Sequence, residues 1–145
     1  MTHRILVYGG LGNVAQERIF PSLNTLSAIY PIEYATVDLK KSTFGNHYLY
    51  GEEPIKEYNA AIIATPNNTH SAIAIRSLES GLHILCEKPL ANTLISANKM
   101  LQAVQKHPNL TSMQSDHYIY KRQLKMKIFT MYLFSDIVLR KQEWK

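Results

Sequence analysis

The chain has 145 residues, 46% hydrophobic and 19% charged, a composition typical of one globular domain with a buried core. It shows no secretory signal pattern and no apolar run near the roughly 18 residues of a membrane helix, and its single cysteine excludes an internal disulfide framework. The net charge is +5, but residues 116–145 carry +4 of it (seven Lys or Arg against three Asp or Glu), so we expect no nucleic-acid binding. We also expect a cytoplasmic protein that does not bind a membrane.

Five short runs predict β-strands because they are apolar, rich in β-formers and closed by turn residues. In chain order they are 4–10, 32–39, 60–65, 83–87 and a weaker run that begins near residue 110. The stretch 40–59 is polar and is broken by Gly45, Gly51 and Pro54. We expect this stretch to be irregular.

Three stretches between these strands show helical spacing, at 14–30, 70–80 and 92–107. Pro21 interrupts the first, which predicts a kink or a restart there. Thr69 is the expected cap of the second helix, Gly81 its stop, and Pro108 follows the third. Strands that alternate with helices over short connections predict a doubly wound α/β fold with a parallel sheet, the Rossmann arrangement.

A glycine turn, GLGNVA, joins the first strand to the first helix. This GxGxxA pattern lies where a dinucleotide motif requires it. Gly10 is expected to permit the tight turn and Gly12 to let the backbone approach a pyrophosphate. Ala15 is expected to keep the helix close to the sheet, while the helix start at Asn13 and Val14 offers N–H donors to phosphate.

Asp38 ends the second predicted strand. A carboxylate there accepts hydrogen bonds from the ribose hydroxyls of adenosine and repels a 2′-phosphate, which favours NAD. Lys40 and Lys41 follow within reach and soften that repulsion, so NADP remains the alternative cofactor. A solvated turn without a ligand is the other interpretation of these residues.

The motif ATPNxxH at 64–70, a helix stopped by Gly81, and a strand that ends in Glu-Lys-Pro at 87–89 occur in this order and spacing. Together they resemble the Gfo/Idh/MocA family of dehydrogenases. GGLGNVAQERIFPSL further upstream resembles the same family's glycine turn and its helix with Pro-x-Leu. The resemblance covers about residues 4–118. It implies a Rossmann domain that binds NAD or NADP and oxidises or reduces a sugar-like hydroxyl or carbonyl.

The resemblance also implies roles for single residues. The residues expected to line the cofactor near its diphosphate and nicotinamide ribose are Thr65, Pro66, Asn67 and His70. Glu87 and Lys88 are expected near the nicotinamide, with Lys88 on the substrate hydroxyl and a cis bond between Lys88 and Pro89. Independently, an ammonium at the carboxyl edge of a parallel sheet can polarise a carbonyl or stabilise an alkoxide. An exposed turn at the strand end is the plain alternative.

SDHYIYK, residues 115–121, resembles the Asp-His-Tyr-x-x-Lys element of glucose-6-phosphate dehydrogenases. That resemblance implies that His117 and Lys121 bind the substrate while Asp116 orients a base. The alternative is a turn in which Asp116 caps a helix. No histidine follows His117 and no Asp-x-x-x-His pair occurs, so the expected general base is Lys88, Asp116 or His117. No histidine pair has metal-ligand spacing, and we expect no metal site.

The sequence therefore predicts a dinucleotide-binding Rossmann domain at 1–118 and an apolar, basic tail at 119–145. In family members a substrate domain follows, so we expect that domain to be absent or truncated here, with the tail as its start. An apolar tail of this kind predicts a homo-oligomer or packing over the sheet edge. The expected function is the NAD(P)-binding domain of an oxidoreductase that moves a hydride between nicotinamide and a sugar or polyol. A non-catalytic NAD(H)-binding module or subunit is the alternative.

Overall fold

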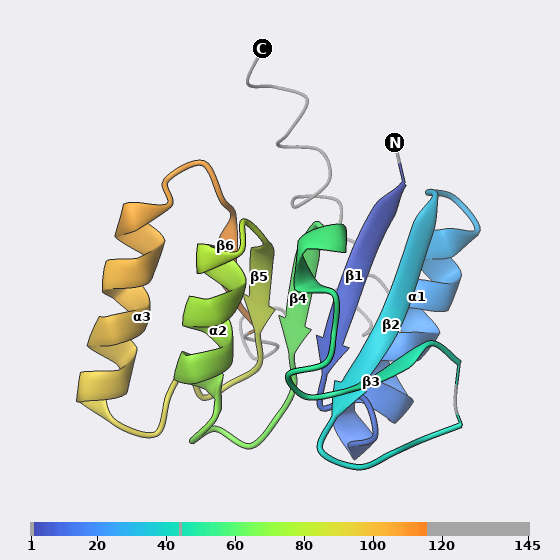
Figure 1. Ribbon diagram of the computed structural model, residues 1–145, viewed down its shortest axis with the longest axis horizontal. Helices are drawn as coiled ribbons and strands as arrows, with labels where there is room; N and C mark the ends of the chain where they lie inside the picture. The colour runs from blue at the N-terminus through green and yellow to red at the C-terminus, as the bar shows by residue number, and fades with distance from the viewer. Residues whose placement is uncertain (1, 44, 116–145) are drawn as a thin grey trace, which may run out of the picture.

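The computed structural model describes residues 2–43 and 45–115. Six parallel strands form one sheet in the order β3-β2-β1-β4-β5-β6 (Figure 1). In chain order the strands are β1 His3–Tyr8, β2 Ile32–Asp38, β3 His47–Leu49, β4 Ala60–Ile63, β5 His83–Cys86 and β6 Ser112–Gln114. The strand order reverses between β1 and β4, and α/β sheets bind ligands at such a switch point, beside the carboxyl ends of the strands. The predicted doubly wound fold is confirmed.

Helices cover both faces of this sheet (Figure 1). One face carries a π-helical turn, Ala15–Ile19, that continues into α1, Phe20–Ser27. The other face carries α2, His70–Glu79, and α3, Leu94–Lys106. A single 3₁₀ turn, Ile55–Glu57, lies between β3 and β4. None of the helices in the described ranges is long and apolar enough to cross a membrane.

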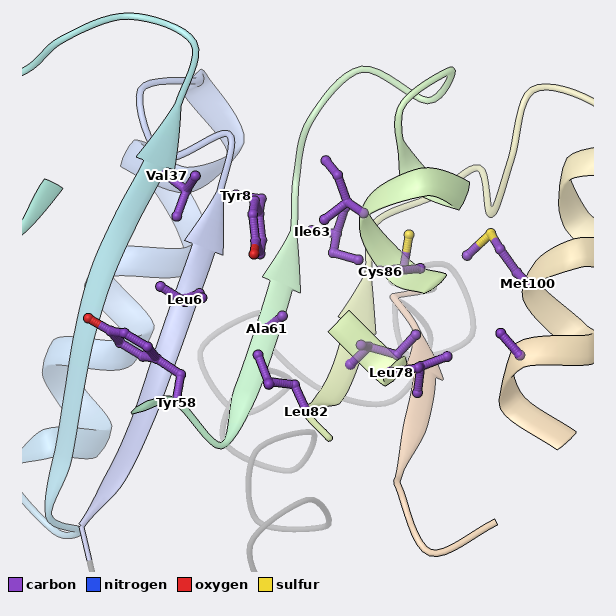
Figure 2. Close-up of a cluster of buried hydrophobic side chains, with 14 of the residues drawn as sticks. Leu6, Tyr8, Val37, Tyr58, Ala61, Ile63, Leu78, Leu82, Cys86 and Met100 are labelled. Carbon is purple, nitrogen blue, oxygen red and sulfur yellow. The ribbon is translucent and has the colours of Figure 1, made fainter. Parts of the chain in front are cut away.

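Alternation along the strands divides the core into two clusters. In β1, Leu6 and Tyr8 belong to the cluster under α2 and α3, whereas Ile5 and Val7 belong to the cluster under α1. Figure 2 shows the first cluster, in which Leu78 of α2 and Met100 of α3 pack toward the sheet. Each fully buried leucine of this kind contributes about 2 kcal/mol of hydrophobic free energy.

The first helix changes form just before Pro21, as the sequence predicted. The Phe20 N–H donates to the carbonyl of Ala15, five residues earlier, and Pro21 then lies in the first turn of α1. Proline has no N–H to donate, so the start of a helical segment is the place where it costs least. The restart is therefore explained by the sequence.

The ends of the other helices match the prediction in part. Gly81 stops α2 with a φ of +84°, and the Thr93 hydroxyl accepts from the Ser96 N–H to cap α3. Thr69 occupies the predicted N-cap position of α2, but its side chain makes no capping hydrogen bond, because its hydroxyl lies 2.7 Å from both the Thr65 hydroxyl and the Pro66 carbonyl. Thr69 therefore ties the loop before α2 rather than the helix itself.

The prediction of an irregular stretch from 40 to 59 is wrong at β3. This strand extends the sheet by pairing Thr36 with His47 and Asp38 with Leu49. Three residues are too short to show a period of two. No pattern in the sequence therefore predicts β3.

Candidate functional site

The turn after β1 requires glycine at two positions for different reasons. Gly9 has a φ of +78°, and a Cβ there would lie 2.6 Å from the Ala64 carbonyl oxygen. Gly10 has no positive φ, but a Cβ there would lie 2.7 Å from Cβ of Thr36 on β2. The tight turn therefore depends on Gly9, and the prediction that Gly10 permits it is wrong. Gly10 instead allows close packing against β2. The doubled glycine in the sequence was the available signal.

Gly12 presents open backbone at the start of the helix. It is exposed, and a Cβ there would meet only the Gly9 carbonyl, at 3.2 Å. Gln16 closes the turn from the helix side, since its Nε2 donates to the Gly10 carbonyl at 2.7 Å. Ala15 is fully buried, which keeps the helix close to the sheet. The first N–H groups of a helix, here from Asn13 and Val14 onward, have no acceptor within the helix, and they suit an anion such as a phosphate.

Asp38 lies beside this turn at the carboxyl end of β2. One carboxylate oxygen accepts from the Leu11 N–H at 3.2 Å, and the other accepts from the Leu39 N–H at 2.7 Å. Each oxygen retains a further lone pair for a ligand hydroxyl. Leu39, which sequence reasoning overlooked, is 82% exposed beside the carboxylate. An exposed leucine directly after the acidic residue offers an apolar contact at this edge.

The loop that follows Asp38 is fixed by His47 of β3. Its Nε2 lies 2.8 Å from the Lys40 carbonyl, and its Nδ1 lies 2.6 Å from the Thr36 hydroxyl. Because a carbonyl only accepts, Nε2 carries a proton in its contact with Lys40. Sequence reasoning also overlooked His47, which holds the backbone at Lys40 in place.

The loop after β4 lies next to the glycine turn, because the Ala64 N–H donates to the Tyr8 carbonyl at 3.0 Å. Pro66 and Asn67 are exposed there, and Thr65 is half-buried. His70 is different: it is 1% exposed, so it does not line an open surface with the other three. Its ring contacts backbone carbonyls instead of facing outward.

The Glu-Lys-Pro turn follows β5 at the same edge. Glu87 is half-buried, and its carboxylate accepts from the Ser115 hydroxyl at 3.1 Å and from the Lys88 N–H at 3.2 Å. Lys88 and Pro89 are exposed, and the peptide bond between them is cis, as the family resemblance implied. Ser115, 6% exposed, is a further overlooked residue that holds Glu87.

Cys86 adjoins this turn without taking part in it. Its side chain is 1% exposed and lies in the core, as predicted. Burial, and then the negative charge of Glu87, raise the pKa of the Cys86 thiol to about 12. The thiol is therefore neutral at physiological pH and is no nucleophile.

The structure thus brings together the predicted residues of four neighbouring loops at one edge of the sheet, where β1, β2, β4 and β5 end (Figure 1). Asp116, His117 and Lys121, the predicted boundary at 118 and the tail 119–145 lie outside the described residues. Within 2–43 and 45–115, no three His, Cys, Asp or Glu side chains gather in a way that could hold a metal ion.

A family model described as "Oxidoreductase family, NAD-binding Rossmann fold" matches residues 4–115. Among curated proteins, levoglucosan dehydrogenase of Pseudarthrobacter phenanthrenivorans is 48% identical over 56 residues, which are 39% of this chain and 14% of that enzyme. Inositol 2-dehydrogenase 1 of Paenarthrobacter aurescens is 47% identical over 49 residues, 34% of this chain and 14% of that enzyme.

Solved structures share the fold. Levoglucosan dehydrogenase in complex with NADH and levoglucosan gives a TM-score of 0.69 at 24% identity, over 84% of this chain and 36% of that one. A 3-ketoreductase from Actinomadura kijaniata in complex with NADP and TDP-benzene gives 0.67 at 20% identity, over 97% and 43%. The chain therefore spans less than half the length of these relatives.

Proposed function

Because the chain belongs to the Gfo/Idh/MocA oxidoreductase family and forms its NAD(P)-binding Rossmann domain, we propose that it serves hydride transfer between nicotinamide and a sugar or polyol. One observation carries the proposal. The glycine turn, Asp38 and the turn at 87–89 converge on one sheet edge, and the hydrogen bond from the Leu11 N–H to Asp38 joins the first two directly.

The residues of this edge fit a dinucleotide. Gly12 leaves the backbone open to a pyrophosphate, since no side chain fills the space above it. Asp38 has lone pairs left for ribose hydroxyls, and the exposed Leu39 can cover a face of adenine. Thr65, Pro66 and Asn67 extend the site toward the nicotinamide end, where Glu87 and Lys88 follow. When bound, the cofactor supplies the nicotinamide carbon that gives or takes the hydride.

Lys88 is the proposed catalytic residue of the described part. Its ammonium is exposed at the turn after β5, so it can donate to a substrate oxygen. There it polarises a carbonyl during reduction or stabilises an alkoxide during oxidation. Glu87 is held in place by Ser115, and its carboxylate also accepts from the backbone N–H of Lys88. Asp116, His117 and Lys121 remain the predicted residues for binding the substrate and moving its proton.

The proposed cofactor is NAD, with NADP as the alternative. The carboxylate of Asp38 points at the glycine turn, where a 2′-phosphate would meet its negative charge. A sugar or polyol substrate is supported by the relatives named above, which act on levoglucosan and inositol.

The test of cofactor binding is a titration of the 145-residue chain with NADH and with NADPH, followed by nicotinamide fluorescence. We expect saturable NADH binding that is tighter than NADPH binding. Asp38→Asn should lower the ratio of the NADPH and NADH dissociation constants by about tenfold, because the repulsion between the carboxylate and the 2′-phosphate is lost. If neither cofactor binds, the proposed site is wrong.

The test of catalysis is turnover with a panel of polyols and anhydrosugars. Lys88→Ala should lower kcat/KM at least about a hundredfold, the scale of one lost transition-state donor. Lys99→Ala, an exposed lysine on α3, is the matched control and should leave turnover unchanged. Full turnover by the Lys88 variant would remove its catalytic role. Tight NADH binding without turnover on any substrate would instead favour a non-catalytic NAD(H)-binding module.

A further inference from the structure

His70 is a buried polar side chain that touches two separate loops. Its Nε2 lies 2.8 Å from the Thr65 carbonyl oxygen, and its Nδ1 lies 2.9 Å from the Pro89 carbonyl oxygen. Thr65 follows β4, and Pro89 follows β5 and comes directly after Lys88. One imidazole ring therefore spans the two loops that carry the proposed nicotinamide-side residues.

The sheet does not provide this connection by itself. The pairing of β4 with β5 ends where Ile63 faces Cys86, followed by a last hydrogen bond from the Glu87 N–H to the Ile63 carbonyl at 2.8 Å. Beyond this point, β4 and β5 continue into separate loops, which lead to α2 and α3. The contacts of His70 with the Thr65 and Pro89 carbonyls therefore join the two loops beyond the last hydrogen bond between the strands.

His70 is well placed for such a bridge, because it belongs to the buried face of α2. Its partners on that face are Ile73, Ala74, Ser77 and Leu78, at helical spacings of three, four, seven and eight. A side chain at the first position of this face is anchored by the helix, while its ring reaches both loops. Carbonyl oxygens only accept, so a neutral ring donates to one of them and a doubly protonated ring to both.

We propose that His70 is a positioning residue that fixes the turn at Lys88 and Pro89 against the loop at Thr65, and thereby sets the place of Lys88 at the nicotinamide. The role of Lys88 at the nicotinamide rests on the proposed function, whereas the bridge between the loops does not. His70 acts through backbone carbonyls and touches neither cofactor nor substrate. This differs from the cofactor-lining role that its place in the ATPNxxH motif implied.

The experiment compares three variants of the full chain. His70→Leu removes both ring nitrogens at similar volume, and His70→Gln keeps an amide donor that can reach one carbonyl. Ile73→Ala is the matched control: Ile73 is 4% exposed on the same face of α2, so its truncation destabilises the core without touching either hydrogen bond. Hydrogen–deuterium exchange without cofactor and NADH titration are the two measurements.

In His70→Leu, we expect the rate of amide exchange at 64–70 and 87–91 to rise about tenfold more than the rate at 34–37 of β2. Tenfold is the factor that corresponds to the loss of one hydrogen-bond donor. Ile73→Ala should not single out these two loops. NADH affinity should fall about tenfold in His70→Leu and less in His70→Gln, whereas Ile73→Ala should retain it. If His70→Leu does not fold, His70→Gln gives the same comparison with a smaller effect.

Two results would overturn the proposal. One is an exchange profile of the His70 variants that matches Ile73→Ala, which would make His70 an ordinary core residue. The other is wild-type NADH affinity in His70→Leu. If the wild-type chain binds no NADH, the proposed function fails, and the exchange comparison alone decides whether His70 joins the two loops.

Discussion

The two halves of the sheet are covered in different ways. In the nicotinamide half, defined as β4, β5 and β6, the crossovers contain α2 with ten residues and α3 with thirteen. In the adenine half, defined as β1, β2 and β3, the crossover from β2 to β4 spans residues 39–59, and its described residues form only the three-residue β3 and one 3₁₀ turn. The adenine half has α1 on one face, but contacts other than helix packing must fix its crossover from β2 to β4.

A buried carboxylate supplies that function in the adenine half. The Glu53 side chain is fully buried; it accepts from the Tyr8 hydroxyl at 3.0 Å and from the Gly51 N–H at 2.6 Å, and it forms an ion pair with Arg76 of α2. Burial, and then the charge of Glu53, raise the pKa of Tyr8. The Arg76 guanidinium also lies 5.3 Å from the centre of the Tyr50 ring. A crossover without a long helix therefore depends on polar contacts between distant parts of the chain.

The largest expected effect comes from breaking that ion pair. Arg76→Ala leaves the Glu53 carboxylate buried without its cation, so the free energy of unfolding should fall by about 3 kcal/mol. Urea unfolding measures the loss. Lys99→Ala, an exposed lysine on α3, is the control and should change stability by less than about 0.5 kcal/mol. A loss below about 1 kcal/mol for Arg76→Ala would mean that the adenine half is held by other contacts.

This contrast also explains what the sequence could predict. The nicotinamide half was predictable because its signals are local: apolar residues at helical spacing in α2 and α3, and Gly81 with a positive φ at a helix end. Glu53 lies 45 residues from Tyr8 and 23 from Arg76, so no window of sequence shows that these side chains meet. The buried network was missed for that reason, and β3 was missed because three residues are too short to show a period of two.

The residues of the candidate site differ in the same way: some are marked by a local pattern, and others depend on contacts between distant parts of the chain. Gly12, Asp38 and Lys88 could be predicted, because a motif or a strand end marks each of them. The role of Gly9 depends on the approach of Ala64 from the loop after β4, and that of His70 on carbonyls five and nineteen residues away. Contacts of this kind are properties of the folded chain, not of a pattern.

Gly10 in the adenine half and Gly81 in the nicotinamide half are required for different reasons. A Cβ at Gly10 would lie 2.7 Å from the Thr36 Cβ, so Gly10→Ala should cost about 2 kcal/mol and weaken NADH binding, since the turn must shift. Gly81 has a φ of +84° with open space around it, so Gly81→Ala should cost about 1 kcal/mol from backbone strain alone. Urea unfolding and NADH titration measure both. Unchanged NADH binding in Gly10→Ala would show that the turn tolerates displacement.

Thr69 and Thr93, the threonines that precede α2 and α3, make different hydrogen bonds. Thr93 accepts from the Ser96 N–H at 3.1 Å, so Thr93→Ala should lower stability by about 1 kcal/mol through loss of the helix cap. The Thr69 hydroxyl caps no helix N–H and instead contacts Thr65 and Pro66 within the loop after β4, so Thr69→Ala should cost less stability and accelerate amide exchange at 65–69. Equal losses of stability would contradict this distinction.

The smallest effect at neutral pH belongs to Cys86, at the end of β5. Burial raises its pKa from the ordinary value of 9 to about 12. A raised folded-state pKa means that the native state holds the proton more tightly than the unfolded state. The resulting stability is fully present below pH 9 and is lost as the pH rises from 9 through about 12. Below pH 9 the native thiol should therefore react with a disulfide reagent only when β5 opens.

Cys86→Ala isolates this contribution, because Tyr8 and Tyr58 also have raised pKa values and remain in both proteins. The urea midpoint of the wild-type chain should fall more steeply between pH 9 and 11 than that of the variant, while the two proteins should differ little in slope between pH 6 and 8. Equal slopes above pH 9 would mean that the thiolate is hydrated in the native state. Water would then reach the end of β5, next to Glu87, as it reaches the exposed loops of the site. The close packing of the nicotinamide half would in that case end before Cys86.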